Sequence, residues 1–148
     1  MIIRPLGEAD LSGILELNRH LNPDDQPLPD RATVEAVWAE IVASKATTCL
    51  GGFVANVLAS TATVTIIPNL TRGCRPYALV ENVVTHSAHR RNGYGRAVLS
   101  AALDLAWSKG CYKVLLLTGS DDENTLRFYE RTGFNPGEKR AFVARPPV

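Results

Sequence analysis

The sequence predicts a single α/β domain on three observations. Apolar residues recur every three or four positions near 11–17, 34–42 and 97–107, which is typical of amphipathic helices. Runs rich in Val, Ile, Thr and Phe lie between these segments and favour strands. The chain of 148 residues is long enough to bury one core. We therefore expect one domain that spans residues 1–148.

The composition favours a small-molecule partner over a nucleic acid or a membrane. The chain has 16 basic and 15 acidic residues and a formal net charge of +1, so it creates no strong field. No apolar run approaches the ~18 residues of a membrane span, and the start lacks the pattern of a signal peptide. We expect a soluble, cytoplasmic protein that binds neither nucleic acid nor membrane.

The three cysteines predict neither disulfides nor a metal site. Cys49, Cys74 and Cys111 are odd in number and widely spaced, without a Cys-x-x-Cys pair or a histidine at ligand spacing. Such thiols are typical of a reducing compartment. We expect reduced cysteines and no metal.

The first part of the chain predicts one strand and two helices. Residues 2–4 form the strand, and the apolar spacing at 11–17 gives the first helix. The segment 22–30 holds three prolines and is expected to be a loop, one that could cover a substrate. Asp30 or Thr33 then begins the second helix.

The middle of the chain predicts an antiparallel sheet. Gly51 and Gly52 suggest a hairpin turn between a short strand that starts at residue 47 and a long strand at 53–67. After a loop with two arginines and a glycine, the chain returns as a strand at 77–85.

The last part of the chain predicts a right-handed βαβ unit followed by a short helix. The helix at 97–107 leads into an apolar strand at 112–118, which we expect to be buried on both faces and parallel to the strand before the helix. A helix at 125–131 ends at Gly133, and residues 140–144 are expected to form an edge strand. The prediction is a mixed, mostly antiparallel sheet with one parallel pair and about four helices.

The basic turn between the strand and the third helix predicts an anion site. Its residues are Arg90, Arg91, Asn92, Gly93, Tyr94, Gly95 and Arg96. Glycines allow close approach of the backbone, a helix N-terminus favours an anion, and arginines suit a pyrophosphate. A dinucleotide-binding loop fits poorly, because eight positions separate Thr85 from Gly93 and Val98 stands where a third glycine is expected. A purely structural turn is the other alternative.

Two blocks of the sequence resemble the GNAT superfamily of coenzyme A-dependent N-acyltransferases. The first block, Arg-x-x-Gly-x-Gly, begins at Arg90. The second block, an asparagine followed by an aromatic-tyrosine pair and then Gly-Phe, is matched by Asn124, Phe128, Tyr129, Gly133 and Phe134. The blocks have the order and separation of the family. The resemblance implies a GNAT fold, in which the parallel strand pair splays apart.

The resemblance also implies that acetyl-coenzyme A is the co-substrate. The turn would hold the pyrophosphate, the preceding strand would pair with the pantetheine arm, and the Val83 amide would point at the acetyl carbonyl. Asn124 would reach the arm from the opposite side. The implied cofactor-binding residues are Val83, Val84, Thr85, Arg90, Arg91, Asn92, Gly93, Tyr94, Gly95, Arg96, Asn124 and Phe128.

Tyr129 matches the family's tyrosine that faces the coenzyme sulfur, and the resemblance implies that it is the general acid. With reference pKa values of about 8.5 for a thiol and about 10 for tyrosine, the leaving thiolate needs little help, so the acid should contribute no more than about 10²-fold.

Removing a proton from the acceptor is the larger task. An alkyl amine with a pKa of about 10.4 is neutral about once in 2500 at pH 7, which costs about 4.6 kcal/mol. Glu81, two residues before Val83, is the candidate base, and an ion pair with Arg75 is an equally good interpretation. His86 and His89 are weaker candidates, because they follow the strand toward the pyrophosphate end.

The acceptor pocket is expected between the first helices, the loop at 69–77 and the C-terminal strands. Its candidate contacts are Asn69, Arg72, Arg75 and Tyr77. If the arginines line the pocket, they would suit an acceptor that carries a carboxylate or a phosphonate.

We therefore predict an N-acetyltransferase that moves the acetyl group of acetyl-coenzyme A to the primary amine of a small molecule, by direct attack in a ternary complex. Two alternatives stay open: a non-catalytic acyl-coenzyme A sensor, and an enzyme that acetylates a protein lysine or N-terminus. The sequence does not identify the amine. The resemblance favours a homodimer, for which the edge of the last strand offers a surface.

Overall fold

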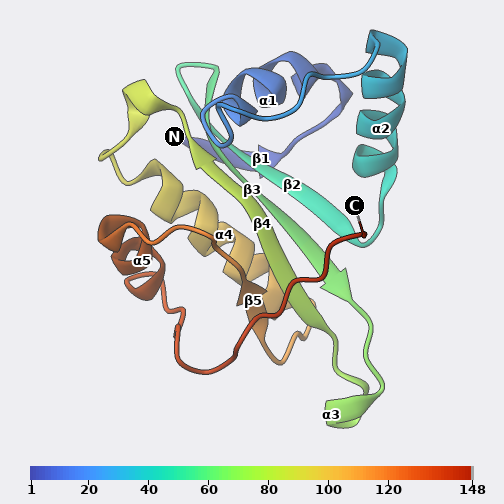
Figure 1. Cartoon of the computed structure of the whole chain (residues 1–148), viewed down its shortest axis with the longest axis vertical. Coiled ribbons are helices and arrows are strands. Elements are labelled where there is room, and N and C mark those ends of the chain that lie inside the picture. The colour runs from blue at the N-terminus through green and yellow to red at the C-terminus, as the bar shows by residue number, and fades with distance from the viewer. Residues whose placement is uncertain (148) are drawn as a thin grey trace.

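The computed structural model describes residues 1–147 and has the predicted α/β architecture, with helices on both faces of one sheet (Figure 1). The five strands stand in sequence order in the sheet. They are β1 (Ile2–Pro5), β2 (Thr47–Val54), β3 (Val57–Ile67), β4 (Tyr77–Thr85) and β5 (Val114–Leu116). Neighbouring strands are antiparallel except for the parallel pair of β4 and β5, as predicted.

The helices divide between the two faces. They are η1 (Glu8–Asp10), α1 (Leu11–Asn18), α2 (Arg31–Ala43), α3 (Thr71–Cys74), η2 (Ser87–His89), α4 (Tyr94–Ser108) and α5 (Glu123–Glu130). One core cluster packs α4, through Val98, Leu99 and Ala102, against the central strands. A second cluster places Leu17 of α1 and Trp38 of α2 on the other face. No helix within residues 1–147 is long and apolar enough to cross a membrane.

Aspartates are the N-cap residues of α2 and α5. The Asp30 carboxylate accepts a hydrogen bond from Thr33 N at 3.0 Å, and Asp122 accepts one from Thr125 N at 2.9 Å. Each bond satisfies an amide that has no partner inside its helix. Of the two residues proposed to begin the second helix, Asp30 is the N-cap.

The predicted position of the hairpin turn is wrong. Gly51 and Gly52 lie inside β2, and the chain reverses at Ala55 and Asn56, whose φ angles of 47° and 65° fit a two-residue hairpin turn. The glycines serve packing instead: a Cβ on Gly52 would lie 2.7 Å from Val98 Cγ2 of α4. A Cβ on Gly51 would instead meet Leu6 and Leu58 on the other face of the sheet, so close packing on the two faces explains the glycine pair.

Two predictions about the end of the chain are also wrong. β5 is shorter than the predicted strand and its residues are half-buried, while the next residue, Leu117, is 56% exposed. Residues 140–144 form no strand; within the described part of the chain, residues 135–147 are an exposed tail that passes β5 (Figure 1). Phe142 in this tail is 92% exposed, so it does not pack against the sheet of its own chain.

Candidate active site

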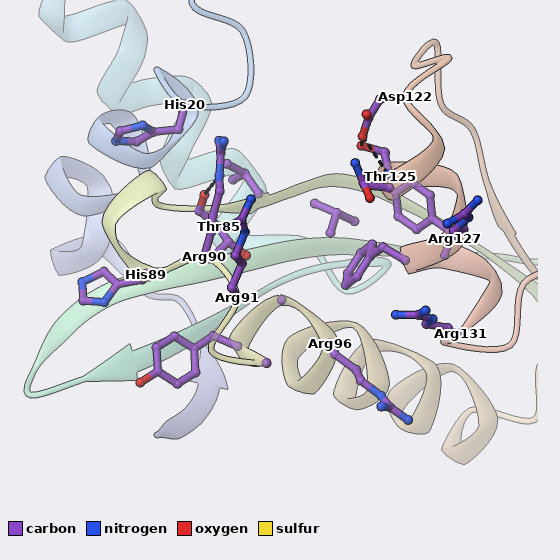
Figure 2. Close-up of a pocket in the computed structure, with 18 of the residues that line it drawn as sticks. His20, Thr85, His89, Arg90, Arg91, Arg96, Asp122, Thr125, Arg127 and Arg131 are labelled. Carbon is purple, nitrogen blue, oxygen red and sulfur yellow. Dashed lines mark hydrogen bonds between the residues drawn. The ribbon is translucent and has the colours of Figure 1, made fainter.

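A cleft of about 770 Å³ opens where β4 and β5 part. Residues 78–80 of β4 pair with β5, and the two strands have no pairing beyond that point, which agrees with the predicted splay. The carboxyl end of β4, the turn before α4 and one side of α5 surround the opening (Figure 2). The unpaired edge of β4, the turn before α4 and helix α5 therefore face one space.

A β-bulge shapes the β4 wall of the cleft. Glu81 pairs with Thr63 and Val84 pairs with Thr61, so Asn82 and Val83 together oppose one residue of β3. Asn82 takes a φ of 50°, a left-handed conformation that asparagine tolerates better than most residues. The bulge changes the direction of the backbone at Val83, which lines the cleft.

The turn before α4 presents free amides at one end of the cleft. Gly93 is the N-cap of α4 with a φ of 77°, and the first α-helical hydrogen bond runs from Ala97 N to Gly93 O at 3.0 Å. The preceding amides, of Tyr94, Gly95 and Arg96, are therefore available to an anion. All three residues line the cleft.

Close packing and hydrogen bonds hold this turn against β4. A Cβ on Gly95 would lie 2.7 Å from Thr85 Oγ1, so the position has no room for a side chain. Arg90 Nε donates to Thr85 O at 3.2 Å, and Asn92 Nδ2 donates to Arg90 O at 3.1 Å. Arg90 lines the cleft, whereas Asn92 supports the turn from within.

The α5 wall carries the second sequence block. Asn124, Phe128 and Tyr129 all line the cleft. The Tyr129 ring is half-buried beside Phe128 and Phe134, with ring centroids 5.2 and 6.4 Å away. Burial raises the pKa of the Tyr129 phenol, so the group keeps its proton at neutral pH and can donate it.

The remaining predicted residues are not brought into the cleft. Glu81 is exposed on β4 and does not line the opening; within residues 1–147 it forms no ion pair, with Arg75 or any other cation. Asn69 and Arg75 hold loops, since Arg75 donates to the carbonyls of Gly110 and Cys111.

Tyr77 lies at the start of β4, at the opposite end of the strand from Val83 and Thr85. Its ring packs on Tyr112, and the Lys113 ammonium lies 5.2 Å from its centroid. Arg72 lies over Tyr112 nearby. These side chains form a separate cluster at the α3 end of the sheet.

Several residues of the cleft were not predicted. They are His20, Leu21, Asp122, Thr125, Arg127 and Arg131, and they line the cleft together with His89, which lies between β4 and the turn before α4. Helical spacing could have identified Arg131, because it follows Asn124 by seven positions and Phe128 by three. Nothing in the local pattern indicates that the turn after α1 reaches the cleft, because that contact depends on tertiary structure.

In the described part of the chain, no three His, Cys, Asp or Glu side chains converge as metal ligands. His86 has a structural role, since its Nδ1 accepts a hydrogen bond from Ala88 N at the start of η2.

The chain is similar to known acetyltransferases. A model of the acetyltransferase (GNAT) family matches residues 14–134. Glucosamine 6-phosphate N-acetyltransferase of Trypanosoma brucei brucei is 33% identical over 146 residues, 93% of this chain and 91% of that protein. Glucosamine 6-phosphate N-acetyltransferase 1 of Oryza sativa subsp. japonica is 33% identical over 147 residues, 89% of this chain and 79% of that protein.

Solved structures extend the similarity to three dimensions. A protein of Agrobacterium tumefaciens str. C58, named provisionally as an acetyltransferase, is 42% identical with a TM-score of 0.93, covering 99% of this chain and 100% of its own. An acetyltransferase of Trypanosoma brucei is 30% identical with a TM-score of 0.80, covering 97% of this chain and 99% of its own.

Proposed function

Because the chain belongs to the GNAT family of acetyltransferases, we propose that it transfers the acetyl group of acetyl-coenzyme A to the primary amine of a small molecule, by direct attack in a ternary complex. The observation that carries this proposal is the composition of one cleft. An unpaired strand edge, a turn of free amides and a protonated, half-buried tyrosine face the same space.

The coenzyme would lie along the cleft from the turn to Tyr129. The amides of the turn and Arg91 would hold the pyrophosphate, the unpaired edge of β4 would bind the pantetheine arm, and Asn124 would contact the arm from α5. This order is supported by the positions of turn, strand and helix around the opening. Most of the binding would come from backbone groups.

Each chemical step then has a candidate group. The neutral amine attacks the thioester carbon, and the Val83 amide stabilises the oxyanion of the tetrahedral intermediate. The intermediate collapses to the amide product and a thiolate, which Tyr129 protonates. Glu81 stays the candidate to carry the proton of the amine to solvent, because its exposed carboxylate lies two residues before Val83.

The names of the curated relatives suggest an acceptor. Because this chain is 33% identical to two glucosamine 6-phosphate N-acetyltransferases over most of its length, we propose an amino sugar phosphate as the acceptor class. Such a molecule combines a primary amine with an anionic group.

A thiol-release assay with a panel of acceptors tests this function. The Cys74→Ser variant should be used, because the exposed Cys74 thiol would react with the thiol reagent. Glucosamine 6-phosphate should release coenzyme A, and glucose 6-phosphate, which lacks the amine, should not. Coenzyme binding without release from any amine would favour a sensor, and a labelled protein product would favour a protein acetyltransferase.

We further propose a homodimer in the cytoplasm. β5 is the last strand of the sheet, and the tail after α5 exposes Phe142 and Val143. An unpaired strand edge beside exposed apolar side chains is a surface that a second copy could cover.

A further inference from the structure

The cleft is far more basic than the chain as a whole. Its charged lining consists of five arginines and one aspartate, a formal charge of +4, whereas the whole chain carries +1. The one acid, Asp122, is already engaged, because its carboxylate accepts hydrogen bonds from Thr125 N and Oγ1 at 2.9 Å each. The cleft therefore suits a ligand with several negative charges.

Two of the five arginines are occupied within the fold. Arg90 Nε donates to Thr85 O, and Arg127 pairs with Glu123 at 2.9 Å. Within the described residues, the other three, Arg91, Arg96 and Arg131, have no acid within 4.0 Å. Arg91 belongs to the turn, whereas Arg96 and Arg131 come from α4 and α5 (Figure 2).

The proposed coenzyme has a second anionic group, its 3′-phosphate, besides the pyrophosphate assigned to the turn. Its pyrophosphate carries about two negative charges, which the free amides and Arg91 can meet. Its 3′-phosphate is a monoester with a charge of about −1.5 to −2 at pH 7. The guanidinium of arginine matches the geometry of such a group.

Building on the proposed function, we infer that Arg131, assisted by Arg96, binds the 3′-phosphate of coenzyme A and makes the cleft select coenzyme A over dephospho-coenzyme A. Arg131 is the C-cap residue of α5 and keeps helical φ and ψ angles of −66° and −14°. Helical spacing therefore aligns it with Asn124 and Phe128, so one face of α5 would contact the arm and then the phosphate. Arg96 would approach the same group from α4.

A competing explanation is that Arg131 only stabilises its helix, because a cation near a helix C-terminus is favourable. That role would affect protein stability and would not distinguish two coenzymes. The selectivity between acetyl-coenzyme A and acetyl-dephospho-coenzyme A is therefore the measurement that separates the two explanations.

The experiment measures the Kd of both coenzymes by calorimetry. Wild-type protein should bind the dephospho form roughly 10- to 100-fold more weakly, the size expected from charge-assisted hydrogen bonds. R131Q together with R96Q should lower this ratio to less than about 3-fold, mainly by weakening acetyl-coenzyme A. R131K should retain part of the preference, because it keeps the charge but loses the two-pronged geometry.

Two controls make the result specific. R91Q should weaken both coenzymes by a similar factor, because both carry the pyrophosphate. R19Q removes an exposed arginine that pairs with Glu16 outside the cleft, and it should leave both affinities unchanged.

Three outcomes would overturn the inference. Equal wild-type affinity for both coenzymes would do so and would leave the proposed acetyltransferase function standing. Full selectivity in the folded double variant would also do so. Failure of wild-type protein to bind either coenzyme would overturn the inference and the proposed function together.

Discussion

At the residue scale, the protonation of Tyr129 supports its proposed role as the acid. Burial raises the pKa of the phenol, so Tyr129 carries the proton that it would donate. Because the leaving thiolate needs little help, Y129F should lower kcat by no more than about 10²-fold, and it should leave the Kd of acetyl-coenzyme A within about 2-fold. With the wild-type enzyme, kcat should fall as the pH rises through the raised pKa. Steady-state rates at several pH values test this, because Y129F should lack that alkaline decline.

The outcome that would contradict this role is an unchanged kcat in Y129F with a slow acceptor whose chemistry limits the rate. Tyr112→Phe is a matched control, because Tyr112 lies in the aromatic cluster at the opposite end of β4. That variant should keep both kcat and coenzyme affinity.

Asp10 provides a second residue-scale prediction, for the stability of the fold against pH. Its carboxylate accepts hydrogen bonds from Arg4 Nη1 and Nη2 at 2.7 and 2.8 Å and from Gly7 N at 2.8 Å. The bonds from Arg4 are the main reason that the pKa of Asp10 is lowered. The stabilisation is therefore complete above the unfolded pKa of about 3.9 and is lost as the pH falls through the folded value.

Urea unfolding of D10N at several pH values tests this pH dependence of the stability. The variant should have a lower midpoint than wild type by the same amount at about pH 7 and about pH 5, and the difference should shrink below about pH 3.5. E16Q, which removes an exposed pair with Arg19, should change the midpoint little. A difference between D10N and wild type that grows toward acid would contradict the assignment.

At the scale of the element, the bulge in β4 allows a test of the proposed role of the Val83 amide. Asn82 has a φ of 50°, so N82G should preserve both the conformation and kcat. N82V should destabilise the fold by about 1–2 kcal/mol and reduce kcat, because a β-branched residue disfavours this region and would shift the Val83 amide. Denaturant unfolding and steady-state kinetics measure the two effects.

Asn56 offers the matched position for this test. It has a φ of 65° in the hairpin turn, outside the cleft, so N56V should cost similar stability without lowering kcat in the folded protein. Equal kcat for N82V and wild type would show that the bulge does not position a catalytic amide.

Elements were predictable wherever one local pattern dominates. The periodicity of α4, the helix start at Asp30 and the glycine motif at Gly93 each carry their own signal, and the structure contains all of them. The hairpin turn was misplaced because Gly51 and Gly52 resemble a turn, whereas Gly52 makes room for Val98 on one face of the sheet and Gly51 for Leu6 and Leu58 on the other. Sequence spacing alone cannot distinguish a glycine needed for packing from one needed for a turn.

At the scale of the whole molecule, the order of the strands in the sheet could be predicted from their order in the sequence. Successive strands are usually neighbours, and βαβ units are almost always right-handed. The residues that line the cleft were harder to predict from the sequence. Arg131 follows the spacing of a predicted helix, whereas His20 reaches the cleft from the other end of the chain through tertiary packing. Residues 140–144 have the composition of a strand, but no strand of this chain pairs with them in the described structure.

That unpartnered tail leads to the prediction for the assembly. Phe142 is 92% exposed and Val143 is 76% exposed, close in sequence to residues that lie beside the outer edge of β5. Light scattering at micromolar concentration should therefore give twice the mass of one chain, and F142D should shift the protein to monomer by placing a charge in the buried surface. V37D alters an exposed apolar residue on α2 and should stay dimeric. A monomeric wild type over the whole concentration range would contradict the dimer, and it would leave the cleft, built entirely from one chain, unaffected.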